Sequence, residues 1–181
     1  MFRFSTEKII EAVAVLVALE RTKTISRLRL LKLLYIADRE SIRETGRPIV
    51  GTKVCAMRNG PVHSEIYDLI KGQHRDEPLW GRHFRTDGYR IELAEDPGRS
   101  RLSRYEIAKL TDVSERRAYD DDWDVAAETH DFPEYQKNYR EGTSTPIPFE
   151  DILEGVGRSA DRAAVLQDAR DKAVADELFG T

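Results

Sequence analysis

The sequence predicts a mainly α-helical protein with a small antiparallel β-sheet (an α+β fold), built as a compact single-domain helical bundle that carries a short strand and a β-hairpin. Two observations predict the helices: residues 5–21 and 26–46 place apolar side chains at helical spacing, and the second stretch is apolar almost all round. A third observation predicts the sheet, because Asp87-Gly88 separates two alternating runs. A chain of 181 residues can bury a sizeable core in one domain.

The first helix is expected to begin after Ser5, because a serine hydroxyl satisfies free backbone N–H groups at a helix start. The second helix opens near Ser26 and ends near Gly46, and Pro48 prevents its resumption. Apolar side chains occupy most of its circumference: Leu28, Leu30, Leu31, Leu33, Leu34, Tyr35 and Ile36. A helix with so little polar surface belongs in the centre of the fold.

Residues 53–72 are expected to form a strand, a turn and a helix. Lys53 to Met57 is rich in β-prone residues, and Asn59-Gly60-Pro61 turns the chain. Pro61 suits the first position of the next helix, since its missing N–H would be unpaired there. That helix would bury Val62, Ile66, Leu69 and Ile70 and stop near Gly72. Farther on, Asp87-Gly88 predicts a two-residue hairpin turn.

The last third of the chain predicts shorter helices. Ser103 and Glu106 form a capping box for a helix that runs to about Ala118. The acids of residues 120–122 cap a short helix that contains Trp123. Residues 142–148 resemble a linker and lead into one turn of helix. We expect residues 1–157 to form the main domain. Residues 158–181 would form a C-terminal helical extension, packed on that domain or projecting from it.

The charges are divided unevenly along the chain. Residues 1–111 hold 21 of the 29 Lys and Arg residues and 15 of the 33 Asp and Glu residues, a net of +6. The remainder, 8 and 18, gives residues 112–181 a net of −10. Two interpretations stay open. The basic half offers a surface to nucleic acid or an acidic partner, or the two halves attract each other in the folded protein.

The sequence lacks the motifs of metal-binding, calcium-binding and nucleotide-binding proteins. Its four histidines lack metal-binding spacing, the acids from Asp120 to Asp124 depart from a calcium loop at Val125, and no phosphate-binding loop occurs. We therefore expect no cofactor, no metal and no catalytic residue. A hydrolase built on Cys55 or His130 is the enzymatic alternative. One cysteine, no apolar run of membrane length and a charged N-terminus favour a reducing cytoplasm.

Basic residues also recur along one face of the second helix, at Arg29, Lys32, Arg39 and Arg43. This face is either the solvated side of a largely buried helix or a surface for an acidic partner or DNA phosphates. No helix-turn-helix accompanies it.

Residues 30–71 carry the most specific signal, in the elements LLKLLYIADR, GRPIVG and MRNGPVHSEIYDLI. Their order and spacing resemble the Panacea domain, the SocA-like antitoxin family of bacterial and phage (including prophage-associated) toxin–antitoxin pairs. Residues 123–133 and 147–153 continue the resemblance more loosely. It implies a cytoplasmic antitoxin that blocks a toxin, usually encoded by the adjacent gene, through direct protein–protein contact.

The resemblance and the polar character of the turn predict a partner-binding site at the exposed residues Arg39, Arg43, Arg58, Asn59 and His63. The C-terminal helix would add specificity for the toxin. Two alternatives stay open besides occlusion of the toxin: an adaptor that delivers its partner to a protease, and a DNA-binding regulator of its own operon.

Overall fold

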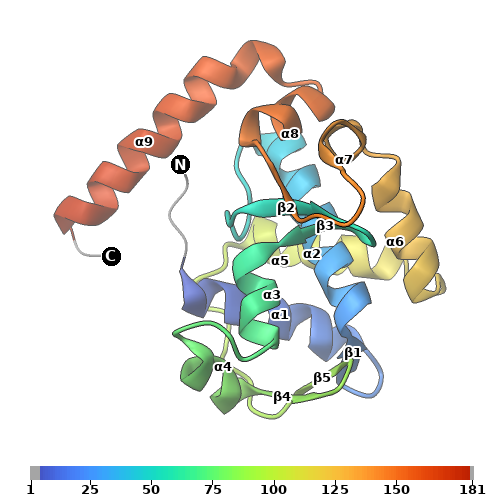
Figure 1. Cartoon of the computed structure of the whole chain (residues 1–181). Helices are drawn as coiled ribbons and strands as arrows, with labels where there is room; N and C mark the ends of the chain where they lie inside the picture. Colours follow the sequence, from blue (N-terminus) through green and yellow to red (C-terminus); the bar gives the residue numbers. More distant parts are fainter. Residues whose placement is uncertain (1–4, 180–181) are drawn as a thin grey trace.

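The computed structural model describes residues 5–179 and places α2 (Arg27–Thr45) through the middle of the molecule (Figure 1). Ser26 caps this helix by accepting a hydrogen bond from the backbone N–H of Arg29 at 3.1 Å. Gly46 ends it in the left-handed conformation, with φ 77°. Its apolar side chains lie in the core, including Leu30, Leu33, Leu34 and Ile36. The predicted central helix is therefore confirmed.

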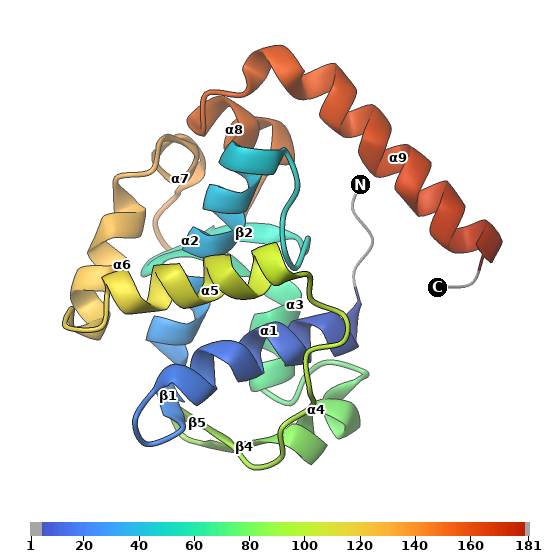
Figure 2. The same cartoon turned by 180° about the vertical axis from the view of Figure 1, so that it is seen from behind.

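Two further helices, α1 (Thr6–Leu19) and α5 (Arg104–Arg116), pack against α2 and against each other (Figure 2). The capping box predicted at the start of α5 is present. Two cations of α5 reach Glu40 on α2: Lys109 Nζ lies 3.2 Å and Arg116 Nη2 lies 2.7 Å from its carboxylate. These contacts fix α5 across the central helix.

One antiparallel sheet lies beneath α1 and contains β1 (Thr24–Ser26), β4 (Phe84–Asp87) and β5 (Arg90–Leu93), in the order β1-β5-β4. The predicted hairpin is confirmed, with Gly88 at φ 56° in its turn. The helix α4 (Glu77–His83) just before it was not predicted. Its sequence holds a proline and a glycine, which indicate a break, yet proline is favoured in the first turn of a helix.

A second antiparallel sheet contains β2 (Val54–Met57), β3 (Gly60–His63) and β6 (Thr145–Ile147), in the order β3-β2-β6. The single predicted sheet is thus two sheets, and the predicted linker contributes a strand. The prediction that Pro61 begins a helix is wrong, because it lies opposite Ala56 in β3. β3 is an edge strand, where proline removes no ladder hydrogen bond. The helix α3 (Ser64–Ile70) starts only after it.

Gly60 is the tightest point of this hairpin, and replacing it tests the corrected register. It has φ 99°, and an added Cβ would meet the Thr129 side chain and lie 3.0 Å from Lys32 Nζ. We expect Gly60→Ala to lower the free energy of unfolding by about 3 kcal/mol, from backbone strain and overpacking together. Urea denaturation measures the loss. Gly98→Ala is the control, since Gly98 also has positive φ but faces open space. Equal losses for the two variants would contradict the packing described here.

The chain then passes through α6 (Asp122–His130), α7 (Pro133–Asn138) and α8 (Phe149–Gly155), which cover one side of α2 and the second sheet. Asp121 caps α6 by accepting hydrogen bonds from two backbone N–H groups. The prediction that an acid among residues 120–122 caps this helix is therefore confirmed. α7 was not predicted, because its six residues are too few to show a helical period.

The C-terminal helix, α9 (Arg162–Phe179), follows a short turn of 3-10 helix, η1 (Ser159–Asp161), and extends from the body as an arm (Figure 1). Its first part contacts the end of α2 and the following loop: Val165 is buried, and Asp168 pairs with Arg47 at 2.6 Å. Val174 is exposed. Three other apolar residues of this helix, Leu166, Ala169 and Ala173, lie outside the described side chains.

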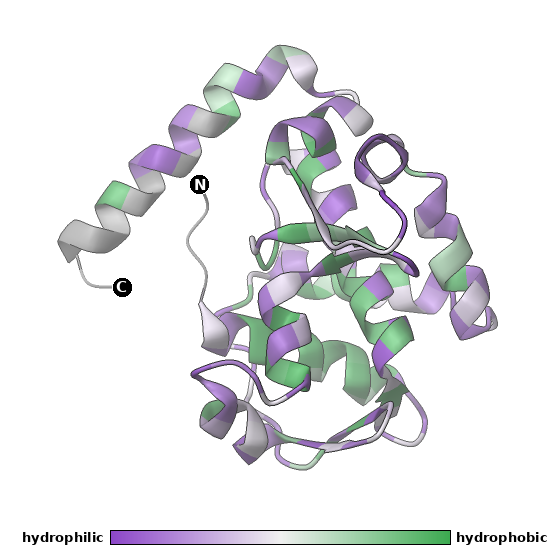
Figure 3. Ribbon diagram, in the orientation of Figure 1, coloured by the Kyte–Doolittle hydropathy of each residue, from purple (hydrophilic) through white to green (hydrophobic). Residues whose placement is uncertain are grey.

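Hydrophobic residues gather along α1, α2 and the strands beside them, and polar residues colour the outer faces (Figure 3). No described helix combines the length and apolarity that a membrane crossing requires. The ion pairs between basic residues of the first part and acidic residues of the second include Arg39 with Glu134 and Arg47 with Asp168. These contacts favour the interpretation that the two halves attract each other.

Candidate functional site

A buried carboxylate on α2 organises the loop that follows it. Asp38 is 3% exposed and accepts hydrogen bonds from the backbone N–H groups of Ile49 at 2.8 Å, Val50 at 3.0 Å and Gly51 at 3.4 Å. Burial raises the pKa of Asp38, while His63 and these N–H donors act in the opposite direction. The aspartate therefore serves as an anchor for residues 49–51.

His63 lies beside this anchor and not on the surface. Its side chain is 1% exposed, with Nδ1 2.7 Å from Thr52 Oγ1 and Nε2 3.6 Å from Asp38 Oδ2. Burial is the main reason that the pKa of His63 is lowered. The prediction that His63 is an exposed contact residue is therefore wrong. It followed from placing residues 61–63 in a helix, whereas they form β3, which packs against α2.

The Arg39 side chain also forms its bonds within the fold. Its Nε lies 2.7 Å from Glu134 Oε1, and its Nη2 donates to the carbonyl of Gly155 at 2.9 Å. Tyr35 donates to the same Glu134 oxygen at 2.7 Å, and burial and this carboxylate raise the pKa of Tyr35. The Arg39 guanidinium lies 4.1 Å from the ring centroid of Phe132. Arg39 thus joins α7 and α8 to α2 instead of facing a partner.

The basic stripe predicted along α2 does not form one surface. Arg29 is 7% exposed and donates to the carbonyls of Asp120 at 2.9 Å and Arg117 at 2.6 Å. Lys32 is 1% exposed, and its Nζ donates to the carbonyl of Pro61 at 2.7 Å. Burial lowers the pKa of Lys32 to about 7. Of the four stripe residues, Arg43 alone has an exposed side chain, at 53%.

The remaining predicted residues, Arg58 and Asn59, are exposed at the β2–β3 turn and line an open groove of about 390 Å³. Two exposed aromatic residues line it: Trp123, the second residue of α6, is 65% exposed, and Tyr89 of the β4–β5 turn is 73% exposed. We call this surface the aromatic groove. Its described lining is Ser26, Arg27, Leu28, Leu31, Lys32, Met57, Arg58, Asn59, Gly60, Val62, Tyr67, Tyr89, Asp122 and Trp123.

Arg27 holds one wall of the aromatic groove. Its guanidinium lies 4.8 Å from the ring centroid of Tyr89 and 5.6 Å from that of Tyr67. Its backbone N–H also donates to the Tyr89 carbonyl at 2.7 Å. The exposed tyrosine is therefore held in place before any partner arrives. Sequence reasoning missed Tyr89 and Trp123 as site residues, although an aromatic residue beside four aspartates was a usable signal.

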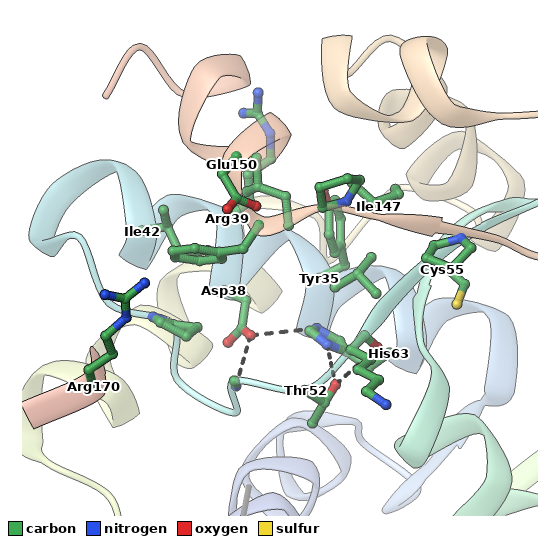
Figure 4. A pocket seen from close by; sticks show the side chains of 18 residues that line it. Tyr35, Asp38, Arg39, Ile42, Thr52, Cys55, His63, Ile147, Glu150 and Arg170 are labelled. Carbon is green, nitrogen blue, oxygen red and sulfur yellow. Dashed lines mark hydrogen bonds and ion pairs between the residues drawn. The ribbon is translucent and has the colours of Figure 1, made fainter. Parts of the chain in front are cut away.

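A separate cavity of about 540 Å³ lies between α2, residues 48–53, β2, the β6–α8 segment and α9 (Figure 4). We call it the α8 pocket. Asp38, Arg39 and His63 line it, as does the half-buried Cys55. Arg43 lines neither cavity. The predicted site residues thus lie in three separate places. Arg58 and Asn59 line the aromatic groove, Arg39 and His63 line the α8 pocket, and Arg43 lies outside both.

Among the side chains that the structure describes, no three of His, Cys, Asp or Glu lie close enough to hold a metal ion. His130 ends α6 as predicted and stacks on Tyr135, with ring centroids 5.0 Å apart.

Comparisons with known proteins fit this picture. No curated protein and no solved structure gave a match. Residues 30–136, more than half of the chain, match the family model described as antitoxin SocA-like, Panacea domain. The match includes α2 from Leu30 onward, the β2–β3 hairpin and α6, and most of the residues that line the aromatic groove lie within it, whereas Ser26, Arg27 and Leu28 precede it. The chain therefore belongs to the SocA-like antitoxin family with a Panacea domain.

Proposed function

We propose that this protein is a cytoplasmic antitoxin that neutralises a cognate toxin, encoded by the adjacent gene, by binding it at the aromatic groove. One observation carries the proposal: the exposed Trp123 and Tyr89 line the same groove as Arg58 and Asn59. Trp, Tyr and Arg are the residue types that contribute most to protein–protein binding energy. Membership of an antitoxin family supports a toxin as the partner.

The groove is suited to a protein surface. Its walls come from α2, the β2–β3 turn, α3, the β4–β5 turn and α6, so their relative positions are set by the packed core. Arg27 restrains Tyr89, which lowers the conformational entropy lost when a partner binds. A pre-ordered aromatic surface supports recognition without catalysis, and we propose a non-catalytic role.

Substitutions in the groove test the proposal. We expect Trp123→Ala or Arg58→Glu to weaken toxin binding by about 2 kcal/mol or more, roughly 30-fold, because each removes an exposed side chain of a type that contributes strongly to binding energy. The measurement is affinity by calorimetry, with growth of cells that express both proteins as the second readout. Tyr119→Ala and Arg82→Glu are matched controls, since both residues are exposed and line neither cavity.

Two outcomes would count against this assignment. If the neighbouring gene product arrests growth and the wild-type chain fails to restore it, the antitoxin role is wrong. If the groove variants bind the toxin as tightly as the controls do, another surface is used. Arg43 and the arm formed by α9 are then the next surfaces to examine.

The amount of toxin distinguishes occlusion from delivery to a protease. Occlusion leaves the toxin level unchanged while growth recovers, whereas an adaptor lowers it. The DNA-binding alternative loses the pattern that motivated it, because Arg29 and Lys32 are buried and bonded to backbone carbonyls. We therefore favour a protein partner over DNA.

A further inference from the structure

The α8 pocket has the form of a ligand site and is distinct from the aromatic groove. Its volume of about 540 Å³ lies within the range of small-molecule pockets. Its walls are largely apolar and come from Ile42 of α2, Val54 of β2, and Ile147, Phe149 and Ile152 of the β6–α8 segment. None of these residues lines the aromatic groove.

The floor of the α8 pocket is polar and deeply buried. His63 and Asp38 face each other there (Figure 4). The oxygens of Asp38 already accept three backbone N–H groups, so its charge is compensated by the protein. His63 Nε2 makes no hydrogen bond with any described residue. The two side chains approach each other at 3.6 Å without a direct hydrogen bond, and they form the polar end of an otherwise apolar pocket.

The rim of the pocket is positively charged. Lys53 and Arg170 line it, both side chains are exposed, and neither has an ion pair within the described part of the chain. Figure 4 shows Arg170 approaching from α9. Of the two acidic residues in the described lining, Asp38 accepts the backbone N–H groups named above, and Glu150 lies 3.5 Å from Arg162 and is partly neutralised. The uncompensated charge at the opening is therefore positive.

We propose that the α8 pocket binds an amphipathic carboxylate, the acid of an acyl or aryl chain. The apolar body lies against Ile42 and Ile147, and the carboxylate lies at the rim between Lys53 and Arg170. An apolar cavity lined by two exposed cations, neither paired with an acid among the described side chains, favours this ligand over an apolar neutral molecule or a cation. Since Arg170 belongs to α9, such a ligand joins the arm to the body of the protein.

Binding of dodecanoate and of dodecylammonium, both below micelle-forming concentrations, tests the charge preference by calorimetry on the full chain. We expect dodecanoate to bind one molecule per chain, and dodecylammonium to bind at least about tenfold more weakly because its charge is reversed. Equal affinities for the two probes would overturn the proposal. Failure of dodecanoate to bind would do the same.

Variants locate the binding. Reversing both rim charges (Lys53→Glu with Arg170→Glu) is expected to weaken dodecanoate binding about tenfold or more, and both positions are exposed, so the fold is retained. Ile147→Trp is expected to abolish binding by filling the pocket, with circular dichroism as the check on folding. Leu28→Trp, in the aromatic groove, and Arg82→Glu are the controls. Loss of binding with Leu28→Trp but not with the rim variant would place the ligand elsewhere and refute the assignment.

Discussion

Raising the pH from 7 to 10 is expected to stabilise the wild-type protein by about 3–4 kcal/mol relative to the Lys32→Met variant. The pKa of Lys32 is lowered by burial from 10.5 to about 7. Between these values an unfolded chain holds the proton that the folded chain has lost. Unfolding then takes up a proton, so it becomes less favourable as the pH rises. Below pH 7 both states are protonated, and the folded state carries the full penalty of a buried charge.

Urea denaturation of both proteins at pH 7, 8, 9 and 10 measures this effect. The difference between wild type and Lys32→Met isolates Lys32, because all other titrating groups are shared. Lys53→Met is the matched control, since Lys53 is an exposed lysine on the neighbouring segment. Parallel stability curves for wild type and Lys32→Met would show that Lys32 remains charged in the fold.

Glu134→Ala is expected to lower the free energy of unfolding by about 3–5 kcal/mol, because it leaves the Arg39 charge largely buried without its carboxylate. Glu134 is 1% exposed and accepts hydrogen bonds from both Tyr35 and Arg39 at 2.7 Å. The variant also removes the bonds through which α7 is held to Tyr35 and Arg39 of α2. Chemical denaturation followed by circular dichroism provides the measurement.

Two further variants show whether the charge or the shape of Glu134 matters. Glu134→Gln keeps the shape and one acceptor, so we expect a smaller loss than with alanine. Glu154→Ala removes an exposed carboxylate that pairs with Lys137, and it is expected to change stability by no more than about 1 kcal/mol. A loss for Glu134→Ala as small as that for Glu154→Ala would mean that Arg39 finds another partner.

The sequence was sufficient to predict the elements whose signals are local. Three such signals are the apolar circumference of α2, the capping box of α5 and the Asp-Gly turn of the β4–β5 hairpin. Each of them is made by residues that are close together in the sequence. In each case the tertiary structure agrees with the local preference, and such agreement is typical of natural sequences.

The hairpin at Pro61 was misassigned because two local preferences compete there. Proline favours the first turn of a helix, but it is also tolerated in an edge strand, and the sequence does not say which strand is at the edge. The answer depends on β6, which pairs with the other side of β2 from more than eighty residues away. Long-range pairing of this kind has no local signature.

The candidate site was predicted only in part, for a related reason. Spacing correctly places Arg29, Lys32, Arg39 and Arg43 on a helix, but it does not reveal which of them find acceptors inside the fold. Those acceptors are distant in sequence: the carbonyl of Asp120 for Arg29 and the carboxylate of Glu134 for Arg39. Arg58 and Asn59 were placed on the surface correctly because a tight turn exposes its residues.

The attachment made by Arg39 has a practical consequence for building hybrids of this protein with its relatives. Its guanidinium bonds to Gly155, and β2 pairs with β6, although both partners lie past residue 136, where the family match ends. A graft limited to residues 30–136 would sever these links and would also discard α1. Swapping recognition properties between homologues therefore calls for junctions outside residues 6–155, so that the transplanted piece brings its own supports.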